Sequence, residues 1–156
     1  MKRCTYTLSA EERALAEEIA RKRDVFHKTL GHEHRAHFEA PLAHLKGTAC
    51  ELAASKKFGL PWNVPFTERM SQARAKPDVG GLQIRHGLSI RPGDDPAGRF
   101  VFAFFDQYAN EVEFLGWMVA SEAMREEWYE HTPRNGGDPY WRVPLRALNP
   151  IETLLP

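Results

Sequence analysis

Two stretches in the first sixty residues carry apolar side chains at helical spacing. A capping box at Ser9–Glu12 opens the first stretch, which predicts a helix that runs to about Leu30. Pro41 suits the first turn of a second helix, which we expect to end at Phe58, just before Gly59. The apolar positions that define the two helix faces are Leu15, Ile19 and Phe26 in the first, and Leu45, Ala49, Leu52, Ala53 and Phe58 in the second.

From Val79 onward the apolar positions recur at every second residue, which is the period of a β-strand. Phe100–Phe105 is apolar throughout, so it predicts a central strand that is buried on both faces. Residues 63–76 have the composition of a polar loop. The other predicted elements are strands at Leu82–His86, Leu88–Arg91 and Glu113–Val119, a short helix from Glu122 to about Tyr129, and an edge strand at Trp141–Pro144.

The order of these elements predicts an α+β fold in which N-terminal helices pack on a mixed, mostly antiparallel sheet. At 156 residues the chain fits a single domain with one core. Within that domain we expect residues 1–40 to form an N-terminal helical extension and residues 41–146 to form the core.

The composition, with 42% hydrophobic and 27% charged residues, is ordinary for a globular protein. No apolar run approaches the roughly 20 residues that a membrane-spanning helix needs, and Met1–Thr7 lacks the apolar segment of a secretory signal. Cys4 and Cys50 are the only cysteines, and they form neither a disulfide scaffold nor a CxxC metal motif. We therefore expect a cytoplasmic protein without a membrane partner.

The net charge is zero, but the charges are unevenly distributed along the chain. Residues 1–99 carry 17 Lys and Arg against 12 Asp and Glu, whereas residues 100–156 carry 4 against 9. A basic front part could approach phosphates, although an ordinary solvated surface is the simpler explanation. The candidate contacts with nucleic acid are Arg21, Lys22 and Arg23 on the first helix, and Lys56 and Lys57 at the end of the second.

Four histidines after the first helix raise the question of a zinc site: His32, His34, His37 and His44. Their spacing does not match the usual patterns of structural zinc sites, and no cysteine is close in sequence. We favour a polar, partly helical connector, and a zinc site stays the alternative.

The strongest chemical pattern joins a helix and two strands in the middle of the chain. Glu51 follows Gly47 by one helical turn, Asp78 lies at a strand end, and Gln83 and Arg85 share one face of the next strand. Carboxylate and amide oxygens hold Mg²⁺ or Mn²⁺, and a neighbouring cation neutralises a phosphoryl group. The pattern therefore predicts a metal site with ligands Glu51, Asp78 and Gln83, and with Arg85 as the phosphoryl-stabilising cation.

In these motifs the chain resembles the PD-(D/E)XK nuclease superfamily, and it is also similar to a narrower family of small phage and bacterial proteins. The resemblance covers about residues 41–146. The matching parts are Gly47–Ala53, the Pro61-Trp62 turn, Pro77–Arg85 with Gln83–Arg85 in place of the (D/E)-x-K triplet, the Ile90–Asp95 loop, Gly116-Trp117 and Val143-Pro144.

The resemblance implies a restriction-endonuclease-like core and a nuclease that hydrolyses DNA phosphodiester bonds with Mg²⁺ or Mn²⁺. Its catalytic residues would be Glu51, Asp78, Gln83 and Arg85. Two departures from the superfamily pattern matter for this function. Gln83 removes a negative charge from the ligand set, and Arg85 replaces a lysine that could transfer protons.

Other interpretations of the same residues stay open. The chain could be a non-catalytic module on the same fold that binds nucleic acid or a protein partner, and it could form a homodimer. Taken singly, Asp78 could cap a turn, and Glu51 could be a buried residue paired with Arg85.

Overall fold

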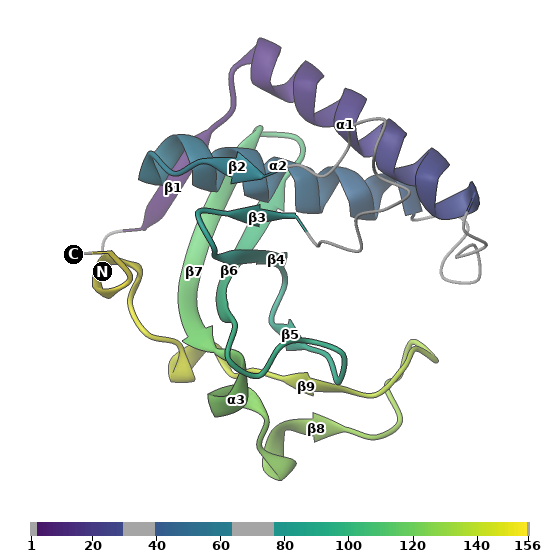
Figure 1. Ribbon diagram of the computed structural model, residues 1–156, viewed down its shortest axis with the longest axis vertical. Helices are drawn as coiled ribbons and strands as arrows, with labels where there is room; N and C mark the ends of the chain where they lie inside the picture. Colours follow the sequence, from purple (N-terminus) through teal and green to yellow (C-terminus); the bar gives the residue numbers. More distant parts are fainter. Residues whose placement is uncertain (1–2, 30–39, 64–76, 156) are drawn as a thin grey trace.

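The computed structural model describes residues 3–29, 40–63 and 77–155 (Figure 1). Its helices are α1 (Ala10–Thr29), α2 (Ala40–Phe58) and α3 (Ala120–Ala123). Its strands are β1 (Cys4–Thr7), β2 (Trp62–Asn63), β3 (Asp78–Val79), β4 (Gln83–His86), β5 (Ser89–Ile90), β6 (Arg99–Asp106), β7 (Glu111–Val119), β8 (Tyr129–Glu130) and β9 (Tyr140–Arg142). Short 3-10 helices lie at Glu126–Trp128, Leu145–Ala147 and Ile151–Thr153.

A four-stranded sheet in the order β1-β7-β6-β4 forms the centre of the molecule. β7 pairs antiparallel with both β6 and β1, whereas β4 pairs parallel with β6. The register of β6 and β7 shifts after Phe102, because Phe102 faces Gly116 while Ala103 faces Phe114. Leu115 is therefore an extra residue in β7, which is a β-bulge. This mixed, mostly antiparallel sheet with its helices confirms the predicted α+β class.

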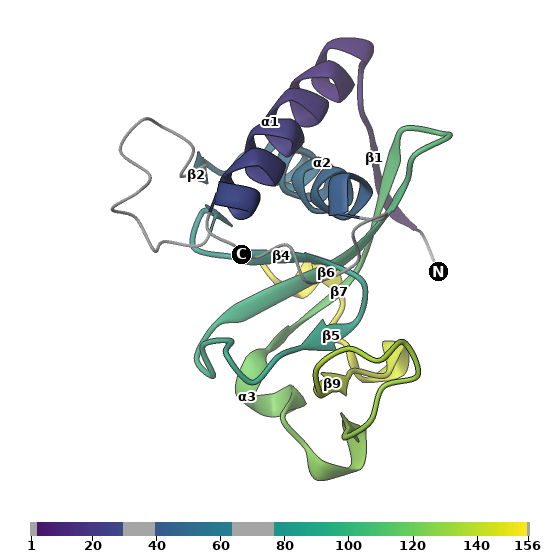
Figure 2. The same cartoon turned by 90° about the vertical axis from the view of Figure 1, so that its right-hand side faces the viewer.

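The two long helices cover one face of this sheet in two layers. α2 lies on the sheet, and α1 crosses the outer side of α2 (Figures 1 and 2). α2 approaches the strands closely because small residues occupy its buried positions, with Ala49, Ala53 and Ala54 fully buried. They share a hydrophobic core with Val101 and Phe105 of β6.

A smaller core covers part of the other face of the sheet. Phe100 and Phe102 of β6 pack there with Ile90, Met118 and Val143, beside α3. A three-stranded sheet in the order β5-β9-β8 adjoins this second core (Figure 1). The two cores place α2 on one side of β6 and the small sheet on the other.

The C-terminal segment lies against β7 at Gly116. The backbones of Trp117 and Asn149 exchange two hydrogen bonds, of 3.0 and 2.9 Å. Gly116 has a φ of +151°, and a Cβ on it would lie 2.6 Å from the Cβ of Leu148. Only glycine therefore permits this close approach of the two segments.

Both long helices occur where the sequence predicts them. The capping box forms as expected: the Ser9 backbone N–H donates to Glu12 Oε1 at 2.9 Å, and the Glu12 N–H donates to Ser9 Oγ at 3.1 Å. The predicted apolar face of α1 is wrong at Leu15, which is 43% exposed, whereas Ala16 and Ala20 are buried. The packing of α1 on α2 favours small side chains over large ones at the contact.

Three predictions about individual elements are wrong. The expected N-terminal helical extension is wrong at Cys4–Thr7, because these residues form β1, which is an edge of the central sheet and pairs with β7. The helix predicted from Glu122 stops after one turn, because Met124 leaves helical geometry at φ −81° and ψ 59°. β9 ends at Arg142 and lies between β5 and β8, so it is not an edge strand.

Candidate functional site

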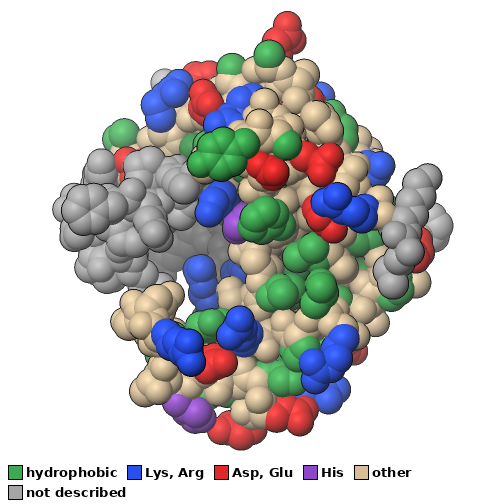
Figure 3. All heavy atoms as spheres, turned by 180° about the vertical axis from the view of Figure 1, so that it is seen from behind, with side chains coloured by type: hydrophobic (Ala, Val, Ile, Leu, Met, Phe, Trp, Pro, Cys, Tyr) green, Lys and Arg blue, Asp and Glu red, His purple; other side chains and the backbone are tan. Residues whose placement is uncertain are grey.

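A cleft with a volume of about 1630 Å³ opens beside β4. Its walls come from α2, β4, the 87–94 segment that contains β5, and the 135–142 segment that contains β9. Glu51, Gln83 and Arg85 line it, so the structure brings three of the four predicted site residues to one cavity. The face of the molecule seen in Figure 3 is hollowed, and Lys and Arg side chains border the hollow.

Glu51 is paired with an arginine from α1. Its Oε2 accepts a hydrogen bond from Arg23 Nη1 at 2.6 Å, and its Oε1 accepts one from Arg23 Nη2 at 3.1 Å. Nη1 also donates to the Thr48 hydroxyl at 2.9 Å. Glu51 is 4% exposed and Arg23 is 6% exposed, so the bidentate pair is almost entirely out of water. The interpretation of Glu51 as buried and paired is confirmed, but its partner is Arg23 rather than Arg85.

A pattern in the sequence predicts the burial of Arg23. Ala16, Ala20 and Arg23 recur at steps of four and three residues, so they lie on one helix face, and the structure buries all three. A helix face that is chosen by its large side chains, including Leu15, does not contain these three residues. Arg23 is therefore neither a solvated side chain nor a surface contact for phosphates, and that prediction is wrong.

Asp78 caps the turn between β3 and β4. Its Oδ1 accepts a hydrogen bond from the Asn63 side-chain amide at 2.7 Å and one from the Gly81 backbone N–H at 3.0 Å. Gly80 and Gly81 adopt φ values of +58° and +84°, which explains two consecutive glycines at this turn. Asp78 is not among the described residues that line the cleft. This geometry matches the turn-capping interpretation of Asp78.

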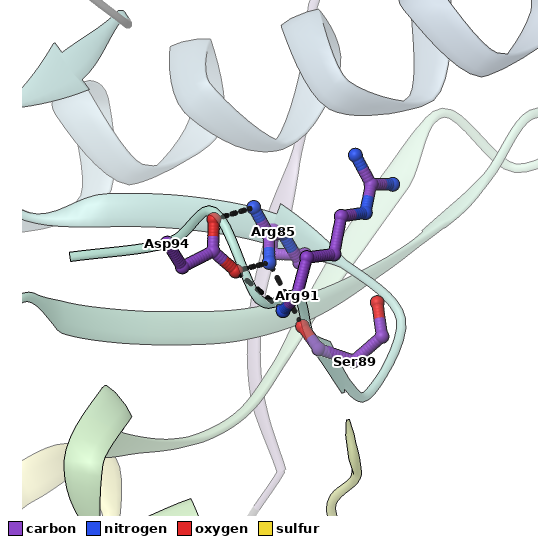
Figure 4. Close-up of polar contacts among 4 residues, drawn as sticks. All are labelled: Arg85, Ser89, Arg91 and Asp94. Carbon is purple, nitrogen blue, oxygen red and sulfur yellow. Dashed lines mark hydrogen bonds and ion pairs between the residues drawn. The ribbon is translucent and has the colours of Figure 1, made fainter. Parts of the chain in front are cut away.

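Arg85 organises the loop that follows β5 (Figure 4). Its guanidinium makes two hydrogen bonds to the Asp94 carboxylate, including one from Nη2 to Oδ1 at 3.0 Å, and Nη1 also donates to the Ser89 carbonyl at 3.0 Å. Asp94 Oδ2 accepts from the Arg91 backbone N–H at 2.7 Å, while the Arg91 side chain points away from Asp94. The guanidinium lies 4.9 Å above the Phe100 ring. Asp94 is therefore a buried partner of Arg85.

The donor set does not fit a divalent metal ion. In the described part of the chain, no three His, Cys, Asp or Glu side chains form a group that could hold one. Mg²⁺ and Mn²⁺ bind carboxylate oxygens, yet both oxygens of Glu51 hold a guanidinium, which is itself a cation. The Asp78 carboxylate accepts hydrogen bonds at the turn between β3 and β4, and Gln83 offers only a neutral amide oxygen. We therefore derive no chemical step through a metal.

The other basic candidates lie on the helices, away from the described cleft lining. Arg21, Lys22, Lys56 and Lys57 are exposed, and Lys22 forms an ion pair with Glu18 at 3.4 Å. None of the four is among the described residues that line the cleft. Their contact with nucleic acid stays a prediction.

Two features predicted from the sequence lie outside the described residues. They are His32, His34 and His37 of the histidine group, and the loop beyond Asn63. The comparisons with known proteins add no family: no protein-family model matches the chain, and no curated protein or solved structure matches it significantly. No helix in the described ranges is both long and apolar enough to cross a membrane. The resemblance to the nuclease superfamily therefore stays a prediction.

The buried pair predicts a large and specific loss of stability on substitution. Arg23→Met leaves the Glu51 carboxylate buried without its partner, so we expect the free energy of unfolding to fall by about 3–5 kcal/mol. The double variant Arg23→Met/Glu51→Leu buries no charge and should recover much of that loss. Urea denaturation followed by circular dichroism measures both. Exposed Arg21→Met is the control, with a change within about 0.5 kcal/mol, and an equal loss in this control would contradict the assignment.

His86, which follows Arg85 on β4, is held neutral by its surroundings. Burial, and to a lesser extent the charge of Lys46, lowers its pKa from 6.5 to about 4. Its Nε2 is buried without a hydrogen-bond partner among the described residues. Its ring lies 5.2 Å from the Phe104 ring, measured between centroids. These contacts indicate a structural role for this histidine.

The lowered pKa makes stability depend on pH between about 4 and 6.5. In that window the unfolded chain binds a proton at His86 that the folded protein does not, so the unfolding free energy falls as the pH falls. We expect His86→Phe to lose less stability than the wild type between pH 7 and pH 5, as measured by urea denaturation. An unchanged pH slope in His86→Phe would show that His86 is not buried in its neutral form.

Proposed function

We propose that the chain is a non-catalytic module that binds the phosphate backbone of nucleic acid, DNA in the first instance, without a divalent metal. One observation carries this proposal. Arg23 satisfies both oxygens of Glu51, so a cation that belongs to the protein already fills the position where a nuclease would need its metal. Glu51 lines the cleft with Gln83 and Arg85, but its carboxylate is held by Arg23 and is not free for metal-dependent chemistry.

The cleft lining carries Arg85, Arg91 and Arg142 against Glu51, Asp94 and Asp138, and Arg23, which pairs with Glu51, adds one more positive charge. Its two buried carboxylates are each neutralised by arginine, Glu51 by Arg23 and Asp94 by Arg85. Neither carboxylate then presents an uncompensated negative charge to a phosphate. Arg142 of β9 lines the cleft, is exposed, and forms no ion pair within the described ranges. Its planar guanidinium suits two hydrogen bonds to one phosphate group.

A metal-dependent nuclease is the second candidate, and one observation favours it. Glu51, Gln83 and Arg85, three of the four residues that the nuclease resemblance implies, line the same cleft, whereas Asp78 is not among its described lining residues. Catalysis at this site would require Arg23 to leave Glu51 and a metal to replace it. The two candidates therefore differ in whether a divalent cation is needed for binding and whether the DNA is cut.

Substitution of Arg142 tests the proposed function. We expect the protein to bind fluorescein-labelled oligonucleotides equally well in EDTA and in Mg²⁺, as followed by fluorescence anisotropy. Arg142→Gln should weaken binding several-fold at low salt and lower the slope of log K against log salt by about 0.7–0.9, the share of one phosphate contact. Arg146→Gln is the matched control, because Arg146 is exposed nearby and is not among the described lining residues.

Three outcomes would overturn this proposal. One is the absence of oligonucleotide binding at low salt, and another is an equal effect of Arg142→Gln and Arg146→Gln. The third is cleavage of DNA in Mg²⁺ or Mn²⁺ that is lost in Glu51→Gln, which would establish the nuclease instead.

A further inference from the structure

One aromatic side chain of the central strand β6 is left exposed in the cleft. Phe100, Phe102 and Phe104 alternate along β6, and the first two are buried in the second core. Phe104 lines the cleft and is 51% exposed. Among the described residues, the second core covers Phe100 and Phe102 but does not include Phe104, which contacts the His86 ring.

The surroundings of Phe104 suit a flat, partly apolar ligand group. Leu115, the bulged residue of β7, and Tyr140 of β9 also line the cleft, so apolar and aromatic surface is present on more than one wall. The His86 ring packs on Phe104 at 5.2 Å with an angle of 33° between the rings. Phe104 lies on a hydrogen-bonded central strand, which already holds its backbone in place. Binding of a ligand to its ring therefore costs little conformational entropy.

We propose that Phe104 is a stacking surface for an unpaired base, so that the cleft takes single-stranded rather than double-stranded nucleic acid. This inference rests on the proposed function, because it names the form of nucleic acid that the same cleft binds. A base exposes its face to a protein side chain only where it is not stacked within a duplex. Arg142, on another wall of the same cleft, would hold the backbone while Phe104 holds the base.

The experiment compares a single-stranded oligothymidylate with a hairpin duplex of equal charge, both labelled with fluorescein and followed by anisotropy. We expect the wild type to bind the single strand at least tenfold more tightly. Phe104→Ala should weaken single-strand binding by about tenfold and leave duplex binding unchanged, whereas Phe104→Trp should keep or strengthen single-strand binding. Tyr108→Ala is the matched control, because Tyr108 is an aromatic residue that is 92% exposed and is not among the described residues that line the cleft.

The outcomes separate this inference from the proposed function. If single strand and duplex bind equally and Phe104→Ala changes neither, while Arg142→Gln weakens both, the stacking inference is wrong and the proposed function stands. If neither oligonucleotide binds, both fail, and a protein partner becomes the explanation for the exposed ring. The urea midpoint of Phe104→Ala is measured in parallel, and Phe104→Trp keeps the test decisive if the alanine variant does not fold.

Discussion

A single buried ion pair, Arg23 with Glu51, determines both how the helices pack and what the candidate site can do. It joins α1, whose Ala16 and Ala20 are buried, to α2. Two charges out of water are tolerated only with good geometry, and here two hydrogen bonds link the guanidinium and the carboxylate while Thr48 accepts a third. The same geometry commits Glu51 to a structural role.

A second arginine–carboxylate pair repeats this principle at the mouth of the cleft. Arg85 holds Asp94, and Asp94 in turn accepts the Arg91 backbone N–H, so the loop after β5 is fixed to the parallel strand β4. The buried carboxylates of Glu51 and Asp94 at the cleft are therefore each neutralised by an arginine of the same chain. The exposed residues that line the cleft include Arg142 and the half-exposed Phe104, together with Arg91 and Asp138. We propose that Arg142 and the aromatic ring of Phe104 contact single-stranded nucleic acid.

Local signals in the sequence predicted much of the fold. The capping box of α1, the end of α2 before Gly59 and the strand at the apolar run of β6 act through residues close in sequence, and these elements appear as predicted. The expected burial of β6 on both faces is wrong at Phe104, which is 51% exposed. Contacts between distant residues were missed. β1 pairs Cys4 with Phe114 across more than a hundred residues, and no short-range pattern encodes such a pairing.

In the candidate site too, local sequence signals predicted one part, and a contact between distant residues was missed. Alternation along β4 correctly placed Gln83 and Arg85 on the cleft, because the side-chain period of a strand is fixed. The partner of Glu51 was not predicted, because Arg23 lies 28 residues earlier on another helix. The motif around Glu51 predicts a metal ligand, but a tertiary contact makes its carboxylate the ion-pair partner of Arg23. This contact is the physical reason that the motif does not predict the chemistry of the residue.

The most direct test is a crystal soaked in Mn²⁺ and measured at the manganese absorption edge. The account predicts density for the Arg23 guanidinium against both oxygens of Glu51 and no anomalous peak within coordination distance of that carboxylate. An anomalous peak bound to Glu51, with Arg23 displaced from it, would contradict the account and restore the metal-dependent nuclease.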